Sequence, residues 1–205
     1  MTFRFPDNET AAIAAALRSD GWCLRRNVLD AELCAGLRAD LRHGAAALQP
    51  AAVGRGDAHR LAATERGDRT LWLDGATPVQ RHFLALMAQL REDLNRALLL
   101  GLFDYEAHYA HYPPGAFYRR HLDAFRASAG RPQRLLSTVC YLNEDWNPAA
   151  GGELLLWRGD DEIARIEPHR GDAVFFLSDE FPHEVLPATA DRYSIAGWFR
   201  GAGAG

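Results

Sequence analysis

The sequence has few of the features that mark secreted, membrane or disulfide-rich proteins. It carries only three cysteines, Cys23, Cys34 and Cys140, which stand singly in apolar surroundings without a C-x-x-C pair. We expect them to be reduced, buried thiols of a cytoplasmic protein, because disulfides persist mainly in oxidising compartments. No apolar run approaches membrane-spanning length. Acidic residues soon follow Met1, so we expect no signal peptide.

Excess positive charge and nucleotide-binding motifs are also missing. The formal net charge is −4, which argues against a general nucleic-acid binder. There is no G-x-G-x-x-G and no Walker A sequence, so the nucleotide-cofactor folds lose their main support. We therefore expect neither nucleic-acid nor membrane partners. Composition leaves the oligomeric state open.

The length and apolar content predict one globular domain over residues 1–205, because 205 residues that are 48% hydrophobic can bury a sizeable core. Helices are expected in residues 1–100. Asp30 can cap a helix in which Leu33, Leu37 and Leu41 form one stripe, and Thr77 with Pro78 can begin the longest helix, to about Leu100. Residues 49–67 show neither helical nor strand periodicity. They are interpreted as a long, mobile surface loop that could cover a substrate.

Residues 101–200 change to short β-branched and aromatic runs separated by turns. The predicted strands are Tyr105–Tyr112, Phe117–His121, Leu135–Leu142, Glu153–Trp157, Glu162–Ile166, Ala173–Phe176 and Tyr193–Phe199. Seven or eight short strands suggest an antiparallel barrel or a double-sheet jelly roll. Because helices come early and strands late, the predicted class is α+β, with a double-stranded β-helix core buttressed by N-terminal helices.

His121-Leu122-Asp123 is the first candidate for chemistry. Residues two apart on a strand share a face, so this H-x-D can aim an imidazole and a carboxylate at one point. His183, in the later sequence Pro-His-Glu-Val, can complete a set of two histidines and one carboxylate. That set holds one face of a non-haem Fe(II) and leaves the opposite positions open for a co-substrate and O2.

Arg192 directly precedes the last predicted strand, Tyr193–Phe199, which has the composition of an inner strand. An arginine inside a barrel needs an anion, since an unpaired buried charge is very costly, and its planar fork suits a carboxylate. A dicarboxylate with a 2-oxo-acid end for iron and a distal carboxylate for Arg192 satisfies both groups. That molecule is 2-oxoglutarate.

Seven motifs between Arg66 and Phe199 resemble, in order and spacing, the catalytic domain of the Fe(II)/2-oxoglutarate prolyl hydroxylases. Within that family the resemblance is strongest to the hypoxia-inducible-factor type, including its bacterial members, because of Arg66-Gly67-Asp68 and the Thr70–Gly75 segment after it. The motifs are Tyr112–Gly115, Tyr118–Asp123, Tyr141–Trp146, Gly151–Leu154, Phe175–Asp179, Pro182–Val185 and Arg192–Phe199.

The resemblance implies a role for each matching residue. His121, Asp123 and His183 would bind Fe(II), and Arg192 would hold the distal carboxylate of 2-oxoglutarate. The remaining matches are Tyr141, which would share that carboxylate; Tyr112, near the metal; Arg134 and Trp198, which would contact the substrate around its proline; and Arg66 with Asp68, in the segment that closes over the substrate. O2 is the other co-substrate, and ascorbate is a candidate auxiliary reductant. Ala196 departs from the family, which has a hydroxyl-bearing residue there.

Three hypotheses for the function follow. The first is hydroxylation of a prolyl residue in a protein or peptide, with 2-oxoglutarate decarboxylated to succinate and CO2. The second is the same chemistry on a small molecule or a free amino acid. The third is a non-catalytic, ligand-binding jelly roll. Arg-Gly-Asp also occurs four times, which suggests cell adhesion, but each copy is better explained as a polar turn.

Overall fold

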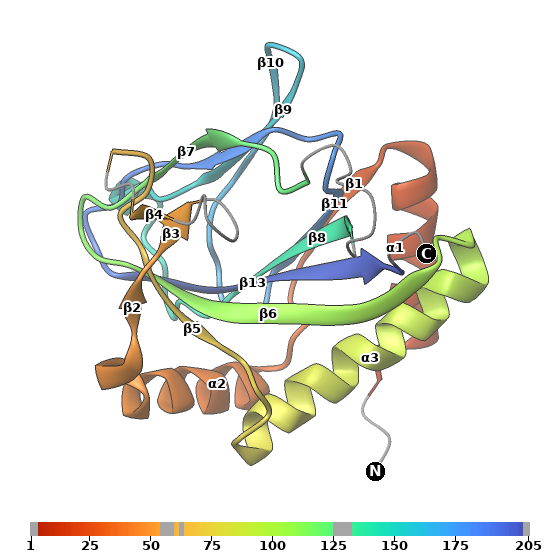
Figure 1. Cartoon of the computed structure of the whole chain (residues 1–205), viewed down its shortest axis with the longest axis horizontal. Helices are drawn as coiled ribbons and strands as arrows, with labels where there is room; N and C mark the ends of the chain where they lie inside the picture. Colours follow the sequence, from red (N-terminus) through yellow and green to blue (C-terminus); the bar gives the residue numbers. More distant parts are fainter. Residues whose placement is uncertain (1–3, 54–59, 62–63, 125–132, 203–205) are drawn as a thin grey trace.

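Two antiparallel sheets face each other, and helices cover the outer face of the larger sheet (Figure 1). The computed structural model describes residues 4–53, 60–61, 64–124 and 133–202. One core lies between the helices and the large sheet, and a second core lies between the two sheets. None of the helices in these ranges is long and apolar enough to cross a membrane. The predicted α+β class with a double-stranded β-helix core is confirmed.

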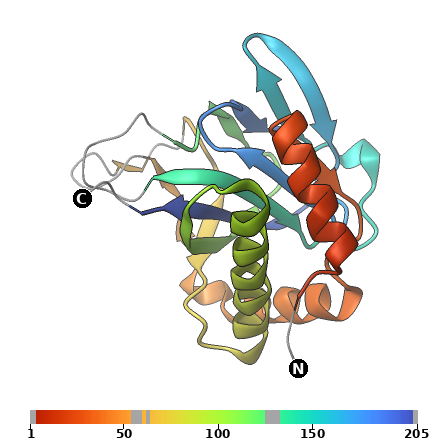
Figure 2. The same cartoon turned by 90° about the vertical axis from the view of Figure 1, so that its right-hand side faces the viewer.

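Three α-helices in the described ranges support the large sheet from outside (Figure 2). They are α1 (Asp7–Ser19), α2 (Ala31–His43) and α3 (Pro78–Leu98), and the short 3-10 helix η1 (Ala45–Ala47) follows α2. The predicted caps are present: the Asp30 side chain accepts from the Leu33 backbone N–H, and the Thr77 hydroxyl accepts from the Gln80 N–H. Their leucine stripes are buried, so helix packing stabilises the sheet that carries the site.

The large sheet runs in the order β1-β11-β8-β13-β6-β5-β2. Its strands are β1 (Trp22–Arg25), β2 (Gln49–Pro50), β5 (Arg69–Trp72), β6 (Leu102–Tyr112), β8 (Arg134–Tyr141), β11 (Ala173–Leu177) and β13 (Arg192–Gly201). The long strands β6 and β13 pair along almost their whole length. β6 begins before its predicted start, and β13 extends beyond its predicted bounds at both ends. The reason is that their pairing continues past the apolar runs from which the strands were predicted.

The small sheet has the order β10-β9-β12-β7. Its strands are β7 (Tyr118–His121), β9 (Leu154–Arg158), β10 (Asp161–Ile166) and β12 (His183–Val185), and η3 (Pro148–Ala150) precedes β9. β12 has no apolar run to mark it, although His183 was expected on a strand brought beside that of His121, and this expectation is confirmed. A strand of three residues is too short to show a period, and it forms because β9 and β7 pair with it on both sides.

The interpretation of residues 49–67 as a loop without strands is wrong in part. β2 lies in this segment and pairs with β5, while β3 (Ala52–Val53) pairs with β4 (Arg60–Leu61). These strands have only two residues each, which is too short for local periodicity to reveal them. Residues 54–59 and 62–63 of the predicted loop lie outside the described residues.

A tight contact joins the last strand to the helix-covered core. The Tyr105 hydroxyl is buried against Gly197 and makes a 2.9 Å hydrogen bond with the Thr138 hydroxyl. A Cβ added at Gly197 would lie 2.1 Å from the Tyr105 oxygen, which is far inside van der Waals contact. The absence of a side chain at Gly197 therefore lets the Tyr105 ring pack against β13.

We expect Gly197→Ala to destabilise the protein by about 1 to 3 kcal/mol, because overpacking forces the Tyr105 ring to move. Chemical denaturation with tyrosine fluorescence would measure the change. Ala196→Ser is the matched control, since Ala196 is the next residue on the strand and lines a cavity. Equal unfolding midpoints for the wild type and Gly197→Ala would contradict the packing described here.

Candidate metal and co-substrate site

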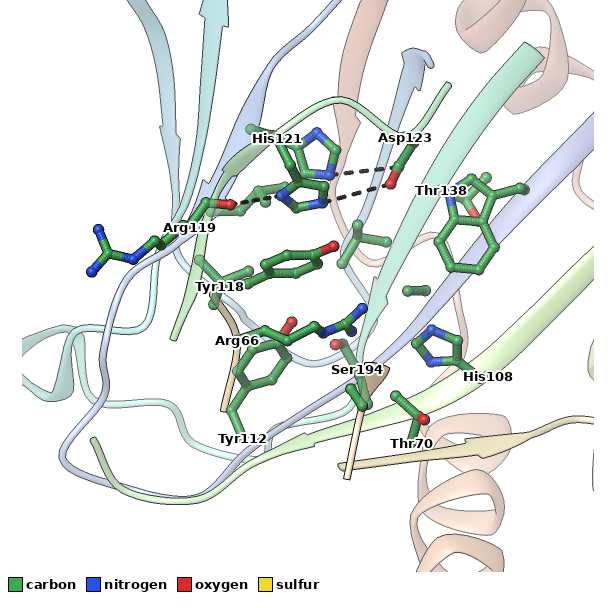
Figure 3. A pocket seen from close by; sticks show the side chains of 18 of the residues that line it. Arg66, Thr70, His108, Tyr112, Tyr118, Arg119, His121, Asp123, Thr138 and Ser194 are labelled. Atoms are coloured by element: carbon green, nitrogen blue, oxygen red, sulfur yellow. Dashed lines mark hydrogen bonds and ion pairs between the residues drawn. The ribbon is translucent and has the colours of Figure 1, made fainter. Parts of the chain in front are cut away.

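The two histidines of the predicted triad are cross-strand neighbours. β12 pairs with β7 so that His183 lies opposite His121, and their ring centroids are 4.2 Å apart. His121 is the last residue of β7 and Asp123 lies just beyond it, so the expected placement of both ligands at the end of one strand holds for His121, while Asp123 is in the segment that follows. The chain bends there, which brings the carboxylate back to the two imidazoles (Figure 3).

The three side chains converge at the distances expected around one metal ion. His121 Nε2 is 3.6 Å from Asp123 Oδ1, and His183 Nε2 is 3.5 Å from Asp123 Oδ2. All three potential ligand atoms lie within 4.8 Å of one another. Two imidazoles and one carboxylate on one side of an ion are the donor set of non-haem Fe(II) oxygenases.

Backbone carbonyls set the orientation of both imidazoles. Nδ1 of His121 donates to the Arg119 carbonyl at 2.7 Å, and Nδ1 of His183 donates to the Phe181 carbonyl at 3.1 Å. Since a carbonyl can only accept, each neutral ring carries its proton on Nδ1 and presents the Nε2 lone pair to the site. The rings are therefore held in the tautomer that binds a metal.

The protonation states also favour a cation. Burial lowers the pKa of His183 to about 4, so this ring is neutral at pH 7. Burial works in the opposite direction on Asp123, but the adjacent His183 and His121 outweigh it and hold the pKa of Asp123 well below its usual value. The Ser137 hydroxyl donates to the same carboxylate at 2.7 Å. The site thus combines a buried carboxylate with the Nε2 atoms of two imidazoles, a donor set that fits a divalent metal.

A second buried charge, Arg192, lies in the same cavity. Its side chain donates from Nε to the Gly152 carbonyl at 2.9 Å and from Nη1 to the Ser194 hydroxyl at 3.2 Å. Within the described residues, neither Nη2 of Arg192 nor the Tyr141 hydroxyl has a hydrogen-bond partner, although both atoms are buried. Two unmatched donors beside one another fit a carboxylate that comes from outside the chain.

Two tyrosine rings flank the Arg192 guanidinium. Its central carbon is 4.9 Å from the centroid of the Tyr112 ring and 5.3 Å from that of Tyr141. Burial raises the pKa of both phenols, so both hydroxyls stay protonated at pH 7. Tyr112 lines the cavity, whereas Tyr141 is fully buried behind it. The resemblance placed Tyr141 at the distal carboxylate and Tyr112 near the metal; in the structure both rings lie beside Arg192.

The cavity encloses about 470 Å³ and is lined from both sheets. Figure 3 shows its side chains pointing toward one another from facing strands. It brings together the triad, Arg192, Tyr112, Arg66, Arg134 and Trp198. Most of the residues predicted from the sequence therefore share one space.

Asp68 is placed differently from the prediction that it contacts substrate. Its side chain is fully buried and is not among the cavity-lining residues. Both its oxygens accept from Arg66, each at 2.7 Å, and the Arg66 guanidinium lies 4.1 Å from the centroid of the Tyr118 ring. In this structure Asp68 holds Arg66, and Arg66 faces the cavity.

Arg134 and Trp198 form another part of the cavity wall. The Arg134 guanidinium lies 3.5 Å from the Trp198 ring centroid, and it donates to Glu106 at 3.0 Å. An aromatic plane backed by a cation is a rigid surface for a small apolar ring. This wall is therefore suited to contact a substrate.

Four residues at the site had no predicted role. Tyr118 stacks on the His121 ring with centroids 3.6 Å apart, and Ser137 donates to Asp123. His108 and Trp72 line the cavity on β6 and β5. Alternation along β6 could have identified His108, since residues spaced by two from Tyr112 share its face. Tyr118 lies on β7 with His121, but residues three apart on a strand are not expected to stack. The roles of Ser137 and Trp72 depend on contacts between segments distant in sequence.

The fold and the site together define the class: a double-stranded β-helix with two histidines, one carboxylate and a buried arginine is a 2-oxoglutarate- and Fe(II)-dependent oxygenase. A family model described as the 2OG-Fe(II) oxygenase superfamily matches residues 107–200. Among solved structures, a Pseudomonas putida prolyl-4-hydroxylase superposes with a TM-score of 0.84 at 44% identity, covering 95% of this chain and 100% of that one.

Other relatives agree. Egl nine homolog 1 of Rattus norvegicus is 35% identical over 144 residues, which are 65% of this chain and 41% of the rat protein. A Trichoplax adhaerens prolyl hydroxylase, solved with a hypoxia-inducible factor peptide fragment, shares the fold with a TM-score of 0.78 at 23% identity, covering 94% and 89% of the two chains. The chain belongs to the prolyl hydroxylases of the 2OG-Fe(II) oxygenase superfamily, which uses Fe(II), 2-oxoglutarate and O2.

We expect His183→Ala to weaken metal binding by more than about a hundredfold, since even outer-sphere partners of a ligand cost 10- to 100-fold. Titration with Mn(II), followed by electron paramagnetic resonance, measures this without turnover. His169→Ala is the control, because His169 pairs with Glu167 on a surface turn. Unchanged Mn(II) affinity in His183→Ala would mean that the triad does not bind the metal.

Arg192→Lys should leave Mn(II) affinity unchanged and weaken 2-oxoglutarate binding roughly a hundredfold, because a lysine keeps the charge but loses the planar fork. Calorimetry of 2-oxoglutarate binding to the Mn(II)-loaded protein would measure it. Arg200→Lys is the matched control at the far end of β13, where Arg200 pairs with Asp104 and Glu106. Equal 2-oxoglutarate affinity in the wild type and Arg192→Lys would rule out the assigned anion site.

Proposed function

We propose that this protein hydroxylates a prolyl residue in a protein or peptide, with 2-oxoglutarate converted to succinate and CO2. The main support for this proposal is that three features lie in or directly against one cavity. They are the triad, the unmatched donors of Arg192 and Tyr141, and the wall of Arg134 and Trp198. The likeness to the Pseudomonas putida prolyl-4-hydroxylase along its full chain supports the choice of proline.

The metal would be held by His121, Asp123 and His183, and when bound it supplies the activation of O2 that oxidises a C–H bond. The residues of the chain supply position and protection. Arg192 and the Tyr141 hydroxyl would donate to the distal carboxylate of 2-oxoglutarate, which sets the distance of its other end from the triad. Among the lining side chains, the rings of Tyr112, Tyr118 and Trp198 would limit the water that reaches the reacting groups once substrate is bound.

A peptide substrate is favoured by the mouth of the cavity. Trp72 and Leu122 line it, and their relative exposures of 52% and 36% make them two of the few exposed large hydrophobic residues in the described ranges. Exposed apolar side chains at the rim of a site suit contact with a chain that extends beyond it. Arg66, held by Asp68, adds a fixed donor on the same rim.

The state of the three cysteines is relevant to the cellular compartment of the enzyme. All three are free and buried, and burial raises the pKa of Cys23 to about 12 and that of Cys34 to about 11, so both remain unreactive thiols. This supports a reducing, cytoplasmic setting as part of the proposal.

The test is turnover of a proline-containing peptide library with Fe(II), 2-oxoglutarate and 18O2, read by mass spectrometry. We expect a subset of prolines to gain one labelled oxygen atom in step with succinate formation, and His121→Ala to abolish both. Oxygen transfer to free L-proline in place of any peptide would move the assignment to the small-molecule hydroxylases. Succinate formation with neither substrate labelled would contradict proline as the target.

A further inference from the structure

His108 is a buried histidine that faces the cavity and that the metal and anion sites do not use. It lies on β6 directly across from Ala196 on β13 and from Trp72 on β5. Its ring is 5.1 Å from the Trp72 ring and 5.3 Å from the Trp198 ring, measured between centroids. Figure 3 shows His108 at the same side of the cavity as Thr138. Two aromatic neighbours therefore hold the imidazole in one orientation.

The hydrogen bonds of His108 decide which nitrogen carries the proton. Nδ1 lies 3.0 Å from the Tyr109 carbonyl oxygen, which can only accept, so Nδ1 is the donor. Burial, together with Arg66 and Arg134 and against the opposing effect of Asp68, lowers the pKa of His108 to about 4. The ring is neutral at pH 7, and Nε2 carries a lone pair. No donor within the described residues makes a hydrogen bond to this nitrogen.

The position of His108 separates it from the 2-oxoglutarate end of the cavity. Arg192 pairs with Tyr112, while Ala196 pairs with His108, four residues further along the same strands. That spacing is about 13 Å at the usual rise of a strand. 2-Oxoglutarate at pH 7 also offers only acceptors, so it has no proton to give to Nε2. The lone pair of His108 faces the half of the cavity left to the substrate.

We propose that His108 is a substrate-positioning residue whose Nε2 accepts a hydrogen bond from an N–H group next to the pyrrolidine ring that is hydroxylated. This inference rests on the proposed function. A prolyl residue within a peptide has no N–H of its own, so the donor there is the amide of the following residue. In free proline the donor is the ring ammonium. The shared chemistry is an N–H beside the ring.

Ala196 supports this assignment. It stands opposite His108 on the adjacent strand and also lines the cavity, and its methyl group leaves space above the imidazole. A hydroxyl at that position could donate to Nε2 from within the protein. With alanine there, this position offers no donor to Nε2, and the hydrogen bonds of the described residues include none to that nitrogen. A substrate that fails to supply an N–H leaves a partly buried acceptor unmatched, which disfavours its binding.

The experiment compares an amide with an ester. The best substrate from an acetylated, amidated library of the form Ala-Xaa-Pro-Zaa-Ala is remade with an ester in place of the amide that follows proline, which removes only the N–H. We expect the KM of the wild type to rise about tenfold for the ester, with kcat little changed. His108→Leu should show the same rise for the amide and no further rise for the ester.

Two variants control for structure. His108→Gln keeps an acceptor at the site and should retain most of the preference for the amide. His111→Leu removes a histidine from the opposite face of the same strand, where it pairs with Asp191, and should behave as the wild type. Affinity for 2-oxoglutarate and Mn(II) should be unchanged in His108→Leu. If that variant does not fold, the ester comparison in the wild type and in His108→Gln still tests the inference.

The outcomes separate this inference from the proposed function. Hydroxylation of the ester as efficiently as the amide, or an undiminished amide preference in His108→Leu, would overturn the role of His108 and leave prolyl hydroxylation standing. If L-proline is the substrate, a tenfold higher KM in His108→Leu supports the acceptor with the ring ammonium as donor, and an unchanged KM overturns it. No turnover of peptide or L-proline by the wild type would overturn the proposed function and this inference with it.

Discussion

The pairing of β12 with β7 is the contact on which the site depends. β12 has only three residues, yet it lies between two strands whose backbones fix its register. That register puts His183 opposite His121. The chain bends after β7, and this bend places the Asp123 carboxylate beside both rings. A slip of one residue would turn His183 to the other face of the sheet and remove the donor set.

The site keeps two opposite charges buried at separate places, and neither is neutralised by a partner on the chain within the described residues. Asp123 has two imidazoles and a serine hydroxyl around it, and Arg192 has a carbonyl, a hydroxyl and two aromatic rings. Burying an unpaired charge is costly, so a cation and a carboxylate from solution both gain by entering. Two sheets packed over extensive cores provide the stability that tolerates this cost.

Strong local signals were sufficient for much of the fold. Capping residues and the spacing of apolar residues along the chain predict the helices α2 and α3. The alternation of residues after Gly101 likewise predicts the strands there. The short strands β2, β3, β4 and β12 exist only through their partners, so no local pattern announces them. Asp68 shows the same limit for function: its motif was recognisable, but its burial beneath Arg66 was not.

The sequence by itself determined the chemistry: the residue types of the triad, the need of a buried Arg192 for a carboxylate, and the family to which the ordered motifs belong. Only the tertiary structure decided how those groups act, because protonation states and unmatched donors depend on what surrounds each atom. The Nδ1 bonds of the three imidazoles go to carbonyls one or two residues away, but only the backbone conformation of the folded strands brings each carbonyl to its ring. The missing partners of Arg192 and Tyr141 arise from the packing of strands that are distant in sequence.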